Sequence, residues 1–258
     1  MTGPIERIAE LLEADEPRLD QLMAAIASID DSPPSEASIV QHLDRMAGDA
    51  AACSEPGDAL SRVFGTLGFR GNTSRYYDVR NSLIHHVLER RVGIPLTLAV
   101  VAVELARRWG ITLTAVGMPG HVLLGTPDGD RWFDPFVGGR SLTRAGCEEI
   151  FRFIHPDTPF DDGYLEAMTA QMVVGRTLEN LRGACLQAGN RSQLAAVLEL
   201  RAALPFTPVE FRVEYATTLA AIGRYDAAAG ERDLLASLQP AQADHHRLEA
   251  RRLRIHRN

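Results

Sequence analysis

A chain of 258 residues with 45% hydrophobic and 24% charged side chains can form one large domain, or a medium domain followed by a smaller one. Its net charge of −7, from 27 basic and 34 acidic side chains, argues against nucleic acid and anionic membrane surfaces as partners. Its three cysteines lack CxxC spacing, which excludes a disulfide framework and a cysteine zinc site and indicates a reducing compartment. Because no signal-like segment and no run of about 20 apolar residues is visible, we expect a cytoplasmic protein.

The first 70 residues or so are predicted to be helical. Apolar residues recur at helical spacing from Ile5 and again from Leu19. Two prolines then interrupt the pattern, and Ser35 is a candidate N-cap for the next helix. A further helix is expected over about residues 58–67.

Residues 95–109 are predicted to form a buried central helix. Pro95 is suited to a first helical turn, and the residues that follow are apolar on most sides of the helix. The helix before it is expected to be capped by Asp78 or Asn81 and to end at Gly93, the usual stop residue.

The periodicity changes after this helix. Residues 111–116, 121–124 and 131–134 are predicted strands, with a hairpin turn between the last two. Gly138-Gly139 is interpreted as a turn after the third strand. The fold class is therefore α+β, in which a helical N-terminal part and a small antiparallel sheet surround a buried central helix.

The C-terminal part is predicted to be helical and repetitive. Gly189 and Gly223 lie 34 residues apart, and this period with two helices per unit is typical of tetratricopeptide repeats. An ordinary pair of helical hairpins is the alternative interpretation. We predict a first domain over residues 1–160 and an all-α, tetratricopeptide-like segment over 161–258. The basic run 247–257 is interpreted as a solvated helix face or a frayed chain end.

Three features follow one another in a recognisable order: a glycine before a buried helix, a strand that begins with His121, and a strand that ends in Asp134. This order resembles the transglutaminase-like core, in which a cysteine at the helix N-terminus meets a histidine and an aspartate on adjacent strands. In such a site the helix N-terminus lowers the thiol pKa, the histidine accepts the proton and the aspartate orients the imidazole.

The residues of these motifs resemble those of the SirB family, a transglutaminase-like branch often joined to C-terminal tetratricopeptide repeats. The resemblance covers about residues 35–240. It is carried by Gly68-Phe69, Gly71-Asn72, Asn81-Ser82, Gly93-Ile94-Pro95, Pro119-Gly120-His121, Asp134-Pro135-Phe136 and Gly138-Gly139.

The sequence departs from the catalytic pattern at one place. When Gly93 is laid on the glycine before the nucleophile, Pro95 stands where the cysteine belongs, and the SirB branch resembles this chain in lacking it. We therefore expect a degenerate site formed by His121, Asp134 and Pro95. The residues expected to line a binding cleft are Asn72, Asn81, Pro95, Gly120, His121 and Asp134.

Three interpretations of the His–Asp pair stay open. The pair can hold two strands together, it can belong to a retained binding cleft, or it can act in catalysis with another nucleophile. Thr97 is the possible replacement nucleophile, although it need not face His121. Cys53, Cys147 and a bound water are further candidates, and Cys147 follows the expected start of a helix, which could lower its pKa.

No metal site or cofactor is predicted. The adjacent pairs His85-His86 and His245-His246 are expected to point to different helix faces and so not to share an ion. The leading hypothesis is a non-catalytic binding or regulatory protein that acts through a protein or peptide partner. The alternatives are a cysteine-independent hydrolase or acyl-transfer enzyme and a purely structural scaffold. The sequence leaves the oligomeric state open.

Overall fold

The computed structural model describes residues 3–48, 53–205 and 207–256. The chain divides into two compact units, of which the larger comprises residues 10–177 and the other comprises residues up to 9 and from 178 onward. The predicted domain boundary at residue 160 precedes helix α8 (Ala170–Ala188), whereas the two compact units divide inside that helix.

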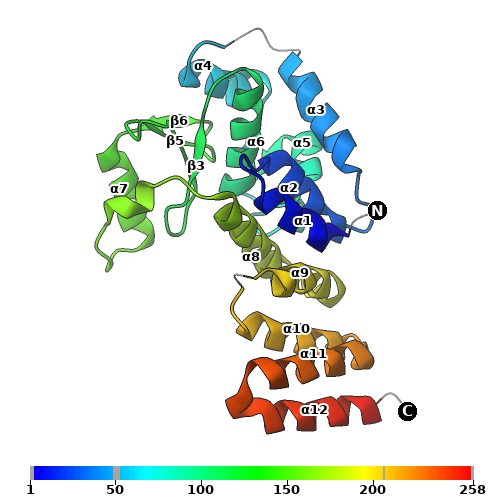
Figure 1. The fold of residues 1–258 in the computed structure, drawn as a ribbon. Helices are drawn as coiled ribbons and strands as arrows, with labels where there is room; N and C mark the ends of the chain where they lie inside the picture. Colours follow the sequence, from blue (N-terminus) through cyan, green and yellow to red (C-terminus); the bar gives the residue numbers. More distant parts are fainter. Residues whose placement is uncertain (1–2, 49–52, 206, 257–258) are drawn as a thin grey trace. The chain divides into compact units, whose positions relative to one another are not determined.

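The part of the chain before the sheet is helical, as predicted (Figure 1). Its α-helices are α1 (Pro4–Leu12), α2 (Leu19–Ile26), α3 (Glu36–Gly48), α4 (Pro56–Leu60), α5 (Ile84–Arg90) and α6 (Pro95–Arg108). Three short elements, η1 (Ala27–Ile29), η2 (Ser61–Thr66, a π-helix) and η3 (Val79–Asn81), lie between them. Ser35 caps α3 as expected, because its Oγ accepts the Ser38 N–H at 3.2 Å.

Helix α5 begins and ends differently from the prediction. Asp78 does act as a cap, but it caps η3, where its side chain accepts the Arg80 N–H. The N-cap of α5 is Leu83, whose side chain has no polar group. The left-handed residue at the other end is Arg91, with φ of 57°, in place of the predicted Gly93. The Arg91 guanidinium donates to the Leu67 carbonyl at 2.6 Å and holds this turn in a conformation that non-glycine residues seldom adopt.

The main sheet has four antiparallel strands in the order β3-β4-β5-β6. Three of them, β3 (Thr114–Val116), β4 (Leu123–Gly125) and β5 (Trp132–Asp134), lie within or overlap the predicted strands. The fourth, β6 (Arg140–Leu142), follows the predicted glycine turn and was not expected. A separate two-stranded parallel sheet joins β1 (Arg70–Gly71) to β2 (Val92–Gly93).

Helix α6 is the centre of the larger unit, as the sequence predicts. It packs against α2, α3, α4 and α5 and against strands β3 and β4 (Figure 1). Its buried residues lie on all sides of the helix, and Leu98, Val100 and Val101 have no exposed surface. The small sheet and the N-terminal helices are thus assembled around one apolar rod.

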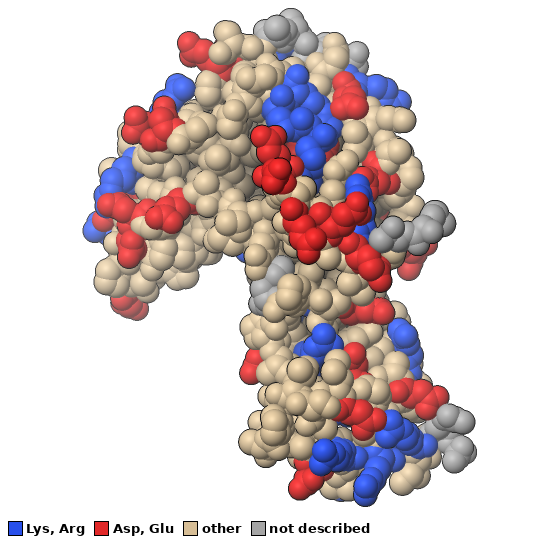
Figure 2. All heavy atoms as spheres, in the orientation of Figure 1, with Lys and Arg blue, Asp and Glu red and all other residues tan. Residues whose placement is uncertain are grey.

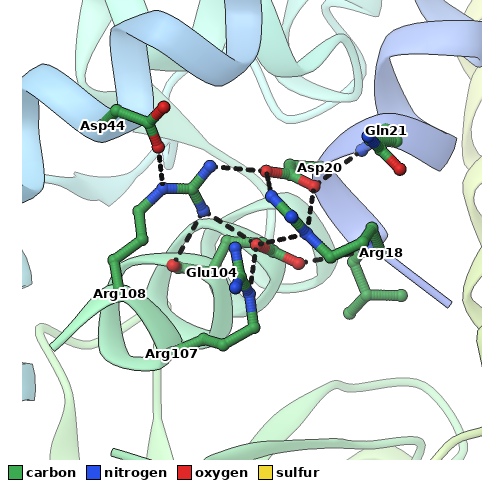
Figure 3. A network of polar contacts seen from close by, with 8 residues as sticks. Arg18, Asp20, Gln21, Asp44, Glu104, Arg107 and Arg108 are labelled. Atoms are coloured by element: carbon green, nitrogen blue, oxygen red, sulfur yellow. Dashed lines mark hydrogen bonds and ion pairs between the residues drawn. The ribbon is translucent and has the colours of Figure 1, made fainter. Parts of the chain in front are cut away.

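An ionic network with a buried centre joins α2, α3 and the end of α6 (Figure 3). Arg108 is at its centre and donates to Asp20 at 2.6 Å, Asp44 at 2.7 Å and Glu104 at 2.8 Å. Arg18 and Arg107 supply the remaining positive charge, with contacts of 2.7 Å to Asp20 and 3.0 Å to Glu104. Buried charges are tolerated only when they are paired in this way.

The same network acts on the pKa of Asp20. Burial by itself would raise this pKa, but the hydrogen bonds from Arg18 and Arg108 and their positive charges bring it below its ordinary value. Asp20 is therefore ionised at neutral pH, and its charge is part of the folded structure.

The C-terminal part is all-helical. It consists of α7 (Arg144–Ile154), the short helix η4 (Asp162–Leu165), α8, α9 (Arg191–Ala203), α10 (Glu210–Ala221), α11 (Tyr225–Leu238), η5 (Pro240–Gln242) and α12 (Ala243–Ile255). From α9 onward, each α-helix packs against the next. Gly189 and Gly223, the two glycines 34 residues apart, follow α8 and α10 and both have positive φ, of 66° and 79°.

Basic side chains gather on α12, where Figure 2 shows acidic groups beside them. Arg252 pairs with Glu249 at 2.7 Å, and Arg254 pairs with Asp233 on α11. In the described residues, no helix is both long and apolar enough to cross a bilayer.

Candidate functional site

His121 and Asp134 lie together, as the sequence predicts. The His121 Nε2 atom is 3.1 Å from Asp134 Oδ1. His121 lies two residues before β4, and Asp134 is the last residue of β5, the strand next to β4 in the sheet. Antiparallel pairing of these strands therefore brings the two side chains together.

Asp134 also organises the turn that follows it. Its Oδ1 atom accepts the N–H groups of Phe136 at 2.9 Å and Val137 at 3.3 Å, and its carbonyl accepts the Gly139 N–H at 2.8 Å. Burial raises the pKa of Asp134, but the hydrogen bond and charge of His121 together with the two backbone donors lower it below its ordinary value. The carboxylate is thus ionised and can only accept in its hydrogen bond with His121 Nε2.

Two glycines of the family-like strings allow close approach around this pair. A Cβ atom on Gly71 would lie 2.5 Å from the Phe136 ring and 2.7 Å from the Phe136 carbonyl oxygen. A Cβ atom on Gly120 would lie 2.6 Å from Ile154, and Gly120 has φ of 76°. Gly71 therefore lets β1 pack against the turn after Asp134, and Gly120 lets the chain before His121 pack against the end of α7.

A residue that the sequence did not indicate holds the His121 backbone. The Arg176 guanidinium donates to the carbonyl oxygens of Met118 at 3.2 Å and His121 at 3.1 Å. Arg176 lies on α8, 55 residues after His121, so its role follows from tertiary packing and no local motif could have identified it.

The His–Asp pair opens onto a cleft of about 660 Å³. Strand β6 and helix α7 supply most of its lining, which comprises His121, Asp134, Arg140, Ser141, Leu142, Thr143, Gly146, Glu149, Ile150, Phe153 and Ile154. Phe153 is 89% exposed, which is unusual for a side chain of this size and leaves an apolar group at the cleft. Sequence reasoning missed β6 and α7 as parts of the cleft.

The structure does not bring the other predicted cleft residues to this lining. Asn72 donates to Asn81 at 3.0 Å, and Asn81 donates to the carbonyls of Arg75 and Tyr76 at 2.7 and 3.0 Å. Both asparagines are buried and stabilise the loop before η3. Pro95 is buried at the first position of α6. Gly120 is near the cleft, because a Cβ atom added to it would meet Ile154, which lines the cleft.

The candidate nucleophiles are engaged elsewhere or buried. The Thr97 hydroxyl is buried and donates to the Asn81 carbonyl at 2.5 Å, so its proton is directed at that oxygen. Cys147 is buried in α7, and burial together with the nearby Asp134 charge raises its pKa to about 11. The helix start therefore does not activate this thiol, contrary to the expectation. Cys53 is buried as well.

The geometric expectation for His85 and His86 is wrong. Both Nε2 atoms lie 2.8 Å from the same oxygen, Oδ2 of Asp30. The ring centroids are 4.2 Å apart, so the two adjacent side chains converge. The pair His245-His246 is more open, with ring centroids 5.5 Å apart, and His246 contacts the Gln239 side-chain oxygen at 2.9 Å.

Relatives of this chain include several UPF0162 proteins. That of Pseudomonas aeruginosa is 33% identical over 171 residues, which make up 66% of this chain and 63% of the relative. That of Xylella fastidiosa strain 9a5c is 48% identical over 92 residues, or 35% of this chain and 33% of the relative. The F-box only protein 21 of Homo sapiens is 34% identical over 104 residues, covering 36% of this chain and 17% of that protein. The matches thus span from about a sixth to under two thirds of these relatives.

A solved structure of menin, described as revealing the binding site for Mixed Lineage Leukemia (MLL) protein, superposes with a TM-score of 0.48 and 11% identity over 96% of this chain and 68% of menin. That likeness is too distant to support an argument. The model of the transglutaminase-like superfamily, in contrast, matches residues 18–179, which is more than half of the chain and includes the paired His121 and Asp134. The chain therefore belongs to the transglutaminase-like superfamily.

Proposed function

We propose that this chain is a non-catalytic binding protein that holds an extended peptide in the cleft beside His121 and Asp134. The observation that carries the proposal is a retained His–Asp pair at an open cleft in a chain with Pro95 at the nucleophile position. Proline has no nucleophilic atom, Thr97 is bonded to Asn81, and the Cys147 thiol is buried with a raised pKa. An oriented histidine without a nucleophile can still form hydrogen bonds with a ligand.

The sheet supports a peptide as the ligand. Strand β6 is at one edge of the sheet, and its three residues all line the cleft. The opposite edge strand, β3, is already covered, because Val116 forms a bridge with Ala167 and the Met168 N–H donates to the Ala115 carbonyl. An extended peptide can pair with an open edge strand through main-chain hydrogen bonds, while pockets beside the strand select its side chains.

The lining of the cleft supports a peptide with an apolar anchor. Phe153 presents an exposed aromatic ring, and Ile150 and Leu142 continue the apolar surface. Arg140 and Glu149 add one charge of each sign. An aromatic anchor with a polar rim is the usual composition of a peptide-binding site.

We also propose two finer assignments. The motif strings support membership of the SirB branch. The turns at Gly189 and Gly223, which lie 34 residues apart and both have positive φ, support tetratricopeptide-type repeats in the helical unit. Such repeats present extended surfaces to protein partners, which agrees with a role in protein binding.

Binding is tested with the full chain and an unbiased library of extended peptides, followed by fluorescence anisotropy on the selected sequences. Phe153→Ala should weaken binding roughly tenfold or more, because an exposed aromatic anchor contributes to binding and little to folding. Ile255→Ala is the matched control, since it removes an exposed large side chain from α12 and should leave binding unchanged.

Failure to select any peptide, or equal binding by the Phe153→Ala and wild-type chains, would overturn the proposed cleft. Peptide cleavage or acyl transfer that is lost in His121→Ala would favour the alternative of a hydrolase or acyl-transfer enzyme.

A further inference from the structure

We propose that Asp30, His85 and His86 form a binding site for one divalent transition-metal ion of the Zn²⁺ type. These residues lie outside the peptide cleft, and the proposal is independent of the function proposed for that cleft. Imidazole nitrogens and a carboxylate oxygen are the donors that such ions prefer.

The donor atoms are already assembled. One ligand atom from each residue lies within 4.8 Å of the others, and Asp30 Oδ2 is 2.8 Å from each Nε2. Ligand atoms around a tetrahedral zinc ion are about 3.3 Å apart, given metal–ligand bonds of 2.0–2.1 Å. Binding of one ion in place of the two Nε2 protons therefore lengthens each Nε2–Oδ2 distance by about half an ångström and sets the two Nε2 atoms, which now lie within 4.8 Å of each other, about 3.3 Å apart.

The local fold explains why adjacent histidines converge. His85 and His86 are the second and third residues of α5, and Asp30 follows η1 directly. Helix α2, which leads into η1, packs against α5, so Asp30 is carried across the start of the helix. The Asp31 N–H donates to Asp30 Oδ1 at 2.9 Å, which fixes the carboxylate and leaves Oδ2 directed at both rings. Such support from outside the ligand set is typical of metal sites.

The site is partly open to solvent. The side chains of His85, Asp30 and His86 are 10%, 19% and 26% exposed. Three protein ligands with this access leave room for water as the fourth ligand, an arrangement found in zinc sites with an open position. His85 Nδ1 is buried without a hydrogen-bond partner in the described residues, so a metal ion on Nε2 would leave the Nδ1 proton without an acceptor. A metal-bound histidine normally donates from its other nitrogen to an acceptor. Because His85 lacks this support, we expect metal affinity only in the micromolar range.

The test is titration of the tag-free, chelator-treated full chain with Co²⁺, followed by visible absorption, and with Zn²⁺, followed by calorimetry. We expect the chain to bind one equivalent of metal. The visible spectrum of the Co²⁺ complex should be that of a four-coordinate ion. His86→Ala and Asp30→Asn should each weaken binding roughly tenfold or more, because each removes a ligand. Both residues are partly exposed, so these variants are less disruptive than a change at buried His85.

His245→Ala is the matched control, because it also removes one histidine of an adjacent pair. In this pair His246 is hydrogen-bonded to Gln239 and, in the described part of the chain, no aspartate joins the two rings. It should leave the titration unchanged. Zn²⁺ should also raise the melting temperature of the wild-type and His245→Ala chains, and not that of His86→Ala. Equal metal binding by wild type and His86→Ala, or no binding by folded wild type, would overturn the site.

Discussion

At the scale of single residues, the region around His121 depends on small side chains as much as on the polar pair. Gly71 belongs to β1, and its Cα position faces the ring and the carbonyl of Phe136. Phe136 in turn donates its N–H to the Asp134 carboxylate. The distance between β1 and this turn therefore affects the position of the carboxylate that orients His121.

Gly71→Ala should destabilise the protein by about 1–3 kcal/mol, the usual cost of overpacking a tight contact. A methyl group at this position meets a carbonyl oxygen 2.7 Å away, and backbone cannot give way as a flexible side chain can. Urea denaturation measures the free energy of unfolding. Gly57→Ala in α4 is the control, because its Cβ would meet nothing within 4 Å, and equal stability of the two variants would contradict the packing argument.

At the scale of elements, the ionic network links α2 and α3 to α6. Arg108 extends from α6 to an aspartate on each of the other two helices. Asp20 is fully buried, whereas the side chain of Asp44 is 58% exposed. The two carboxylates therefore make similar contacts but should contribute very differently to stability.

Asp20→Asn should lower the free energy of unfolding by about 3 kcal/mol or more at neutral pH, because it leaves buried Arg108 short of a counter-charge. Asp44→Asn should cost about 1 kcal/mol or less, since its partner is lost at the surface. Denaturant unfolding of both variants beside wild type makes this comparison, and equal losses would contradict the assigned burial.

The pH dependence follows from the lowered pKa of Asp20. A carboxyl whose pKa is lower in the folded than in the unfolded state contributes its full stabilisation above the unfolded value of about 3.9. This contribution disappears as pH falls through the folded pKa. The stability gap between wild type and Asp20→Asn should thus stay constant from pH 7 to about pH 5 and narrow below about pH 4. A gap that widens in acid would show that the charge on Asp20 is not stabilising.

At the scale of the whole molecule, the sequence predicted the elements that have a clear hydrophobic pattern and the residue pair that belongs to a recognisable motif order. The apolar run after Pro95 predicted α6, and the order of glycine, His121 and Asp134 predicted the polar pair. Strands β1 and β2 have two residues each, and β6 contains only one apolar residue, Leu142, so none of the three shows an apolar pattern. Strand β1 pairs with β2, which follows η3 and α5 in the chain, whereas β6 pairs with β5 directly before it.

The expected and observed sites differ for the same reason. Asn72 and Asn81 were placed in the cleft because they belong to family-like strings, but their side chains bond to one another, to the loop that they stabilise and to Arg90. His85 and His86 were judged from helical geometry alone. Their convergence depends on Asp30, 55 residues earlier, which no local pattern could connect with them.

We propose that this transglutaminase-like chain binds peptide without cleaving it or transferring an acyl group. The most direct measurement is mass spectrometry of the full chain incubated with a peptide selected by the cleft and, separately, with an acyl-transfer probe. We expect both peptide and chain to keep their masses, because Pro95 and the buried Cys147 offer no activated nucleophile. A cleaved peptide or an acylated chain, lost in His121→Ala, would contradict it.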